Sequence, residues 1–106
     1  MSLADQFQQA LLEDSREYTE RTGTNPSRFL QMLSQHAAVE TARLLALSPD
    51  FPEGFTRAWE HKCLELTVEY LMIYGENGRY LPLFDDHVLK AAKRRLKSVG
   101  VTKPKD

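Results

Sequence analysis

Apolar side chains recur at intervals of three and four residues along most of the chain, which is the spacing of one face of an α-helix. The first such face consists of Leu3, Phe7, Ala10, Leu11 and Tyr18. Gly23 follows this stretch and is a natural end for a helix, because glycine adopts the left-handed conformation of a helix C-terminus at little cost. The pattern therefore predicts a helix over residues 3–21.

Two shorter helical stretches follow the first glycine. Asn25 or Thr24 can cap the first of them, and Pro26 fits its first turn, where no amide donor is needed. The apolar face of this stretch consists of Phe29, Leu30, Leu33 and Ala37. A break near Ala37-Ala38 separates it from a further helix, which ends before the turn Ser48–Pro52.

The second half of the chain contains one ambiguous stretch. Residues 64–70 alternate between apolar and polar as in a half-buried strand, but the apolar positions of residues 64–72 also form a helical stripe. Segment length and the helical neighbours favour a helix over 64–73. A short helix is expected before it at 53–61, presenting Phe55 and Trp59 one turn apart.

The end of the chain carries the last helical pattern. Gly75–Gly78 is expected to be a loop, and Arg79–Phe84 is expected to be extended around Pro82. The last helix begins near Asp85 or Asp86, either of which can cap it, and its apolar face is Val88, Leu89, Ala92, Leu96 and Val99. Gly100 ends this helix.

These elements predict an all-α protein, a compact orthogonal bundle of about five helices. The expected core residues are Phe29, Leu33, Leu45, Trp59, Val68, Leu71 and Leu96. With 106 residues, 42% of them hydrophobic, the chain fits one domain. We expect that domain to span 1–100 and to be followed by a polar, flexible tail at 101–106.

Composition favours the cytoplasm. Cys63 is the one cysteine, so the chain cannot form an internal disulfide, which favours a reducing compartment. Residues 1–5 lack the basic and apolar regions of a secretory signal, and no apolar run is long enough to span a membrane. No cofactor and no membrane partner are expected.

Charge divides the chain into an acidic body and a basic end. Residues 1–86 carry seven Arg/Lys and fourteen Asp/Glu, a net charge of −7, whereas residues 87–106 carry seven Arg/Lys and one Asp, a net charge of +6. Four of these cations fall opposite the apolar face of the last helix: Lys90, Lys93, Arg94 and Lys97. Arg95 is expected at the edge of this group, and Lys103 and Lys105 extend it.

The four cations are the best candidate for a binding site in the sequence. They can meet phosphates or an acidic protein in a salt-dependent manner. The alternative is a solvated face whose charges favour a helix C-terminus. No aromatic residues are interleaved with them, which argues against stacking of single-stranded bases.

Other constellations favour structural roles. Glu65 and Glu69 are one helical turn apart and can form a carboxylate pair for hydrolysis, although a salt bridge or solvent exposure is the more common role. Residues 29–47 have the outline of a helix–turn–helix. Arg43 with Glu40 beside it is a poor surface for phosphates, which favours a pair of helices that serves only to pack the core. Cys63 is expected to be a small buried hydrophobe. The sequence predicts no catalytic residue and no metal site.

Several segments also resemble a known family. They are Asn25-Pro26, FLQML at 29–33, VETARLL at 39–45, EGFT at 53–56, Trp59-Glu60, LELTVE at 64–69, Leu83-Phe84 and AAKRRL at 91–96. Together they are similar to a widespread family of small prokaryotic proteins with no assigned activity. The resemblance implies a compact helical domain and a helix at 64–73. The chain departs from the family at Ala37-Ala38, where the family has two glycines, and at 61–65, where it has a Gly-Arg-Leu-Asp type of run.

The sequence therefore predicts a general class of function and no particular activity. A small domain without a catalytic motif most often serves as a protein-interaction or accessory module, and a protein is the expected partner. The split charge is compatible with an accessory subunit or inhibitor in phage–host conflict. The alternative is nucleic-acid binding through the basic last helix.

Overall fold

The computed structural model describes residues 1–105, and within them the chain forms six α-helices and no strand. The helices are α1 (Leu3–Thr22), α2 (Ser27–Gln35), α3 (Ala38–Leu47), α4 (Glu53–Glu60), α5 (Val68–Tyr74) and α6 (Asp86–Ser98). Three 3-10 turns join them: η1 (Leu64–Leu66), η2 (Gly75–Gly78) and η3 (Leu81–Leu83). The expected all-α bundle is confirmed, with six helices in place of about five.

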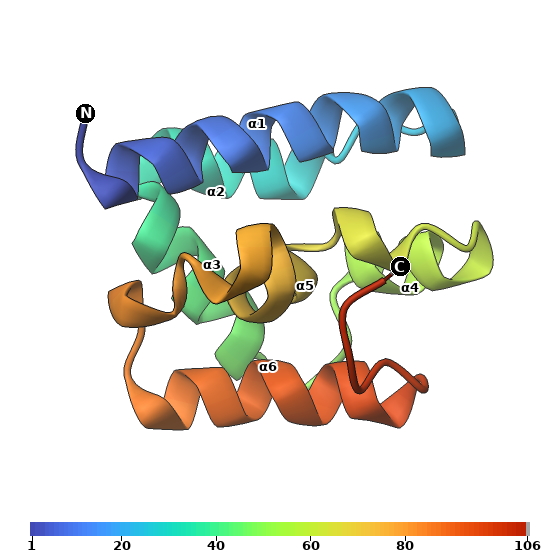
Figure 1. Ribbon diagram of the computed structural model, residues 1–106. Helices are drawn as coiled ribbons and strands as arrows, with labels where there is room; N and C mark the ends of the chain where they lie inside the picture. Colours follow the sequence, from blue (N-terminus) through green and yellow to red (C-terminus); the bar gives the residue numbers. More distant parts are fainter. Residues whose placement is uncertain (106) are drawn as a thin grey trace.

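Helix α3 is the centre of the bundle. Helices α1 and α6 run along opposite edges of the molecule, and α3 and α5 lie between them (Figure 1). The residues that α3 buries are small, namely Ala38, Thr41, Ala42 and Ala46. Small side chains let neighbouring helices approach closely, so α3 contacts α1, α5 and α6.

The core is built around Phe7 of α1, which has 0% of its surface exposed. Its ring packs edge to face against Tyr80 and Phe84, with centroid distances of 5.3 and 5.4 Å. Helix α6 contributes Val88, Ala92 and Leu96 to the same cluster. The rings join the first helix to the segment that leads into the last one, which closes the bundle.

The expected core was partly wrong. Leu71 and Leu96 are buried as predicted, whereas Phe29, Leu33, Leu45 and Val68 are half-buried. Trp59 is 54% exposed. Helix α4 is short and buries Phe55 and Ala58, so Trp59, the next residue along the helix, turns towards solvent.

The ambiguous stretch is helical but interrupted. Residues 64–66 form η1, and α5 begins after Thr67, whose hydroxyl accepts a hydrogen bond from the Tyr70 amide at 3.2 Å. The cap at Thr67 ends one short helix and starts the next. The sequence pattern of this stretch fits both a strand and a helix because two short helical elements, η1 and α5, follow each other there. The prediction of helix over strand is confirmed.

Helix ends follow the sequence at some points and depart from it at others. Gly23 has a φ of 70° and ends α1 as predicted, while Ser2 and Asp5 form a capping box at its start. Pro26 itself occupies the N-cap position of α2, and no side chain caps this helix, so the capping role predicted for Asn25 or Thr24 was wrong.

The segment predicted to be extended around Pro82 forms η3 instead. Glu76 and Asn77, with φ of 48° and 60°, turn the chain just before it, and Tyr80 is buried. A proline is tolerated in a first helical turn, because the amide it lacks would have no partner there.

The residues after α6 return to the body. Val101 packs against the core, and the Lys105 amide donates a hydrogen bond to the Tyr70 hydroxyl at 2.6 Å. Asp106, the last residue of the tail predicted to be flexible, lies outside the described residues. Among the helices of residues 1–105, none has the length and apolar character needed to cross a membrane.

Candidate functional site

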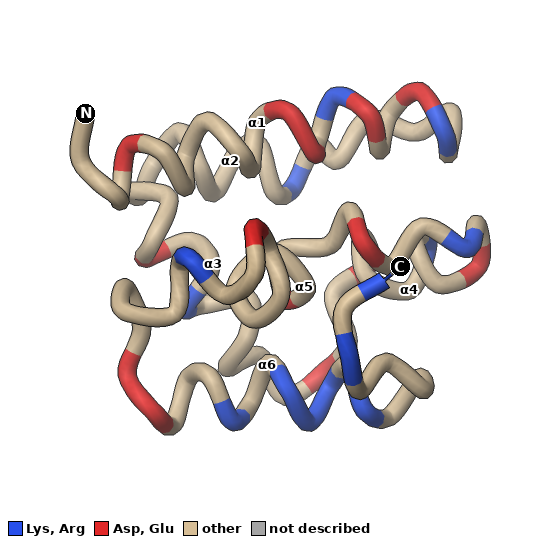
Figure 2. The backbone as a smooth tube through the Cα atoms, viewed as in Figure 1, with Lys and Arg blue, Asp and Glu red and all other residues tan. Residues whose placement is uncertain are grey.

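Helix α6 presents a row of cations to solvent. Lys90, Lys93, Arg94 and Lys97 are all exposed, and their spacing of three and four residues places them on one side of the helix. Figure 2 shows this basic stripe along α6, on the edge of the molecule opposite α1. We call these four residues the basic face.

The basic face differs from most other cations of the protein in having no internal partner. Within residues 1–105, none of its four side chains forms an ion pair, whereas six other cations do: Arg21, Arg43, Arg57, Arg79, Arg95 and Lys105. Four like charges along one helix repel each other, and within residues 1–105 none of them is neutralised by a direct ion pair. The basic face is therefore open to an external anion.

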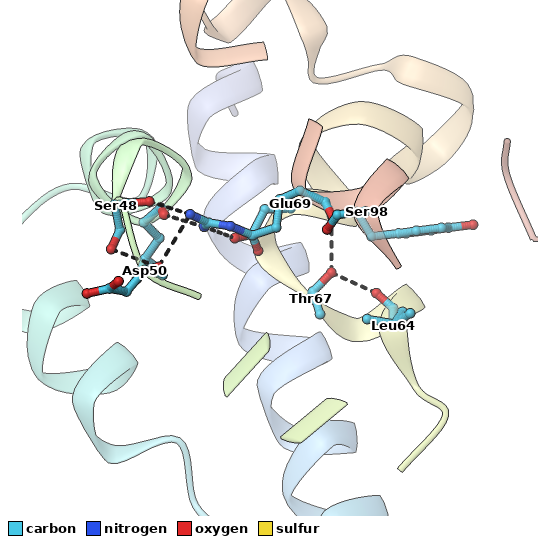
Figure 3. A network of polar contacts seen from close by, with 9 residues as sticks. Ser48, Asp50, Leu64, Thr67, Glu69 and Ser98 are labelled. Carbon is cyan, nitrogen blue, oxygen red and sulfur yellow. Dashed lines mark hydrogen bonds and ion pairs between the residues drawn. The ribbon is translucent and has the colours of Figure 1, made fainter. Parts of the chain in front are cut away.

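Arg95 is not at the edge of this face, as the sequence suggested, but inside the protein. Its side chain is 6% exposed and forms an ion pair with Glu69, Nη1 to Oε2, at 2.8 Å. The same guanidinium donates to the carbonyls of Leu45 at 2.7 Å, Asp50 at 3.4 Å and Ser48 (Figure 3). It also lies 5.5 Å from the ring centroid of Phe51. Arg95 thus joins α6, α5 and the α3–α4 turn.

Glu65 and Glu69, the carboxylate pair considered for hydrolysis, are held in ion pairs with different partners. Glu69 is held by Arg95, and Glu65 by Arg21 at 2.7 Å and Lys105 at 3.1 Å. Burial raises the pKa of the Glu65 carboxyl, but hydrogen bonds from its own amide, Arg21 and Lys105 outweigh burial and lower it overall. The two carboxylates therefore serve separate ion-pair networks.

The remaining sequence candidates are paired or buried within residues 1–105. Arg43 forms an ion pair with Glu40 at 3.0 Å. The arginine that the helix–turn–helix candidate would present to a phosphate is therefore paired with a carboxylate. Cys63 is fully buried as predicted, and burial raises its pKa, which keeps the thiol protonated. Lys105, expected to extend the basic face, is bound to Glu65 instead. No group of three potential metal ligands lies together within the described chain.

Sequence reasoning missed an apolar cleft of about 510 Å³ between α1, α2, the α3–α4 turn and the start of α5. Its apolar lining includes Leu11, Phe29, Met32, Leu45, Phe51 and Phe55. We call it the apolar cleft. Because its walls come from segments far apart along the chain, no local motif identifies it.

A shallower hollow lies beside the C-terminal end of α6. The exposed Trp59 lines it together with Leu64 and Val99, the residue that follows α6. An exposed tryptophan is the type of side chain that most often anchors a protein partner. The sequence favoured a core position for Trp59, with a role as partner anchor for the cluster of Phe51, Phe55 and Trp59 as the alternative.

Asp14, on α1, is the most perturbed carboxyl. Burial, followed by the negative charges of Glu17, Glu13 and Glu65, raises its pKa from 3.8 to about 7. A raised pKa means that the folded state binds the proton more tightly than the unfolded chain does. Stability from this group is therefore fully present below pH 3.8 and is lost as the pH rises to about 7.

Replacing Asp14 with asparagine removes the loss of stability that ionisation of the Asp14 carboxyl causes at neutral and higher pH. We expect Asp14→Asn to raise the melting temperature by several degrees at about pH 8 and to change it little at about pH 4. Thermal unfolding followed by circular dichroism at both pH values tests this. Glu20→Gln, on the same helix, is the control for loss of an exposed carboxylate. Equal shifts of Asp14→Asn at the two pH values would contradict the prediction.

Comparison of the chain with protein-family models, curated proteins and solved structures gives no match. The resemblance to a prokaryotic family therefore stays a prediction. The fold and the surface charge define the structural class of the protein. Residues 1–105 form a six-helix bundle with an acidic body and one basic helix face.

Proposed function

We propose that this protein is a non-catalytic interaction module that binds an acidic protein partner through the basic face of α6. One observation carries the proposal: Lys90, Lys93, Arg94 and Lys97 are exposed together and have no carboxylate partner within residues 1–105. Such a face steers an oppositely charged partner and contributes to specificity. The carboxylates considered for catalysis are held in ion pairs.

Two features favour a protein over a nucleic acid as the partner. Trp59, with Val99, offers an apolar anchor beside the end of α6, and a basic face combined with such an anchor suits a protein surface. The body of the molecule carries −7 over residues 1–86, which repels a polyanion that extends beyond one helix.

The setting of this interaction is part of the proposal. A small module with an acidic body and a basic edge suits an accessory subunit or inhibitor of a larger complex in the cytoplasm of a prokaryote, or in its phage. A role in phage–host conflict belongs to this setting. The free, buried Cys63 is compatible with a reducing compartment.

Nucleic-acid binding is the second candidate, and the linear arrangement of the four cations along one helix favours it. If each cation contacted one phosphate of a duplex, the logarithm of the binding constant would fall with the logarithm of salt concentration with a slope of about −3.6. A duplex of about 20 base pairs, titrated at several salt concentrations and followed by fluorescence anisotropy, measures that slope.

Affinity capture from the native host tests the primary proposal. The wild-type chain should retain a protein after nuclease digestion, and Lys93→Gln/Arg94→Gln should lower its recovery about tenfold, since each charge pair contributes on the order of 0.5–1 kcal/mol. Arg16→Gln/Arg28→Gln is the matched control, because it removes two exposed cations outside the basic face and outside the hollow beside Trp59.

The outcomes separate the two candidates. Loss of the captured protein on nuclease digestion, together with duplex binding of the expected salt slope, would favour the nucleic-acid candidate. Equal capture by the wild type and the Lys93→Gln/Arg94→Gln variant would show that the basic face is not the binding surface.

A further inference from the structure

The apolar cleft contains a polar group that the fold leaves without a partner. Tyr18 lines the cleft and is 6% exposed, yet its hydroxyl has no hydrogen-bond partner among residues 1–105. The hydroxyl oxygen keeps some contact with solvent, because no side-chain oxygen or nitrogen of the described chain is both fully enclosed and unpaired. Burial raises the pKa of Tyr18, so the hydroxyl stays protonated. With no partner inside the protein, the hydroxyl depends on water for a hydrogen bond, and a ligand in the cleft can take the place of that water.

A second polar group lies in the wall of the cleft. The Glu69 side chain is 3% exposed, and its Oε2 accepts a hydrogen bond from Arg95. Its Oε1 has no hydrogen-bond partner within residues 1–105 and is left to accept one. Because Arg95 already neutralises the carboxylate, this wall suits a neutral donor and does not require a cation.

The size of the cleft matches a small molecule. Its volume of about 510 Å³ lies within the range of pockets that enclose drug-sized ligands. Its lining is largely apolar, with aromatic residues such as Phe29 and Phe55. Its polar residues include the buried Tyr18 and Glu69 and the exposed Arg28, Asp50 and Glu53. This combination of an apolar body and a small number of fixed polar groups is the general character of a small-molecule site.

The first turn of α4 lies beside the Tyr18 hydroxyl. Gly54 lines the cleft, and a Cβ atom built on it would lie 3.9 Å from the Tyr18 hydroxyl oxygen. The adjoining α3–α4 turn is held by Arg95 through the carbonyls of Ser48 and Asp50. The rim is therefore fixed by contacts that do not involve the Tyr18 hydroxyl.

We propose that the apolar cleft binds a small, neutral, aromatic molecule that carries a hydroxyl or amine group. The rings of the cleft bury its apolar body, and the Tyr18 hydroxyl forms a hydrogen bond with its polar group. This site is separate from the basic face of α6, so its test does not depend on the partner proposed for that face.

The test uses 2-naphthol, which has an aromatic body and one hydroxyl, and naphthalene, which lacks the hydroxyl. Binding to the full chain is followed by amide chemical shifts in two-dimensional NMR. We expect 2-naphthol to bind with a dissociation constant below about 1 mM and to shift amides around the cleft. Naphthalene should bind about tenfold more weakly, because it displaces water from the polar groups of the cleft and forms no hydrogen bond in return.

Variants identify the residue responsible. Tyr18→Phe should weaken 2-naphthol binding roughly three- to tenfold and leave naphthalene binding unchanged, because it removes only the hydroxyl. Tyr74→Phe, at a half-buried tyrosine outside the cleft, is the matched control and should change neither affinity. The melting temperature of each variant confirms that it is folded.

Several results would overturn the proposal. They are absence of 2-naphthol binding at its solubility limit, equal affinity for naphthalene, shifts confined to residues outside the cleft, and insensitivity to Tyr18→Phe. Sedimentation of the free chain tests whether a second copy occupies the cleft, and a dimer dissociated by 2-naphthol would also overturn it.

Discussion

Replacing Arg95 with methionine is expected to lower the free energy of unfolding by about 3–5 kcal/mol. The substitution leaves the Glu69 carboxylate buried at 3% exposure without its cation, and it removes the donor to the carbonyls of Ser48 and Asp50. An unpaired buried charge is far more costly than the net contribution of the pair. Urea unfolding followed by circular dichroism measures the loss.

The neighbouring residue provides the control for Arg95→Met. Arg94→Met removes the same chemical group from the same helix, but Arg94 is exposed, so the change should stay within about 0.5 kcal/mol. The double variant Glu69→Leu/Arg95→Met should recover part of the loss and not all of it, because the turn carbonyls still lack their donor. Similar losses for Arg94→Met and Arg95→Met would contradict the role of Arg95.

Replacing Phe7 with alanine is expected to cost about 3–5 kcal/mol of unfolding free energy. Phe7 is fully buried and packs edge to face on Tyr80 and Phe84, so the truncation leaves a cavity between α1 and the segment before α6. Urea unfolding followed by circular dichroism again measures the change.

Phe51→Ala is the matched control for this truncation. Phe51 is 48% exposed and contacts Phe55 and Arg95 at the edge of the fold, so its loss should be less than half as large. If the two phenylalanines gave equal losses, the ring cluster around Phe7 would not be the centre of the core.

Arg94 and Arg95 show how one helix serves two purposes. Arg94 faces solvent within the basic face, whereas Arg95 is directed inwards and holds the turn that carries Phe51 on the rim of the apolar cleft. The proposed partner surface and the proposed ligand site are therefore joined by a single side chain. Substitutions that test the basic face must leave Arg95 in place.

Local pattern was sufficient to predict the helices and the basic face. The period of apolar residues defines each helix, and Gly23 ends α1 through its backbone conformation, so both depend on neighbours only a few residues away. The same holds for the basic face, because Lys90, Lys93 and Lys97 share one side of α6 whatever the helix packs against. Binding by this face remains a prediction.

Tertiary structure decided the rest, because the interactions join residues far apart in the sequence. Arg95 lies 26 positions from Glu69 and 47 from Ser48, and periodicity on α6 cannot show that a cation is buried against partners at such separations. Trp59 is exposed although it lies one helical turn after the buried Phe55, and the apolar cleft exists only once its walls are assembled. The sequence alone thus determined an all-α chain with a basic last helix. Packing determined which charges are neutralised inside, which stay exposed, and where the cleft lies.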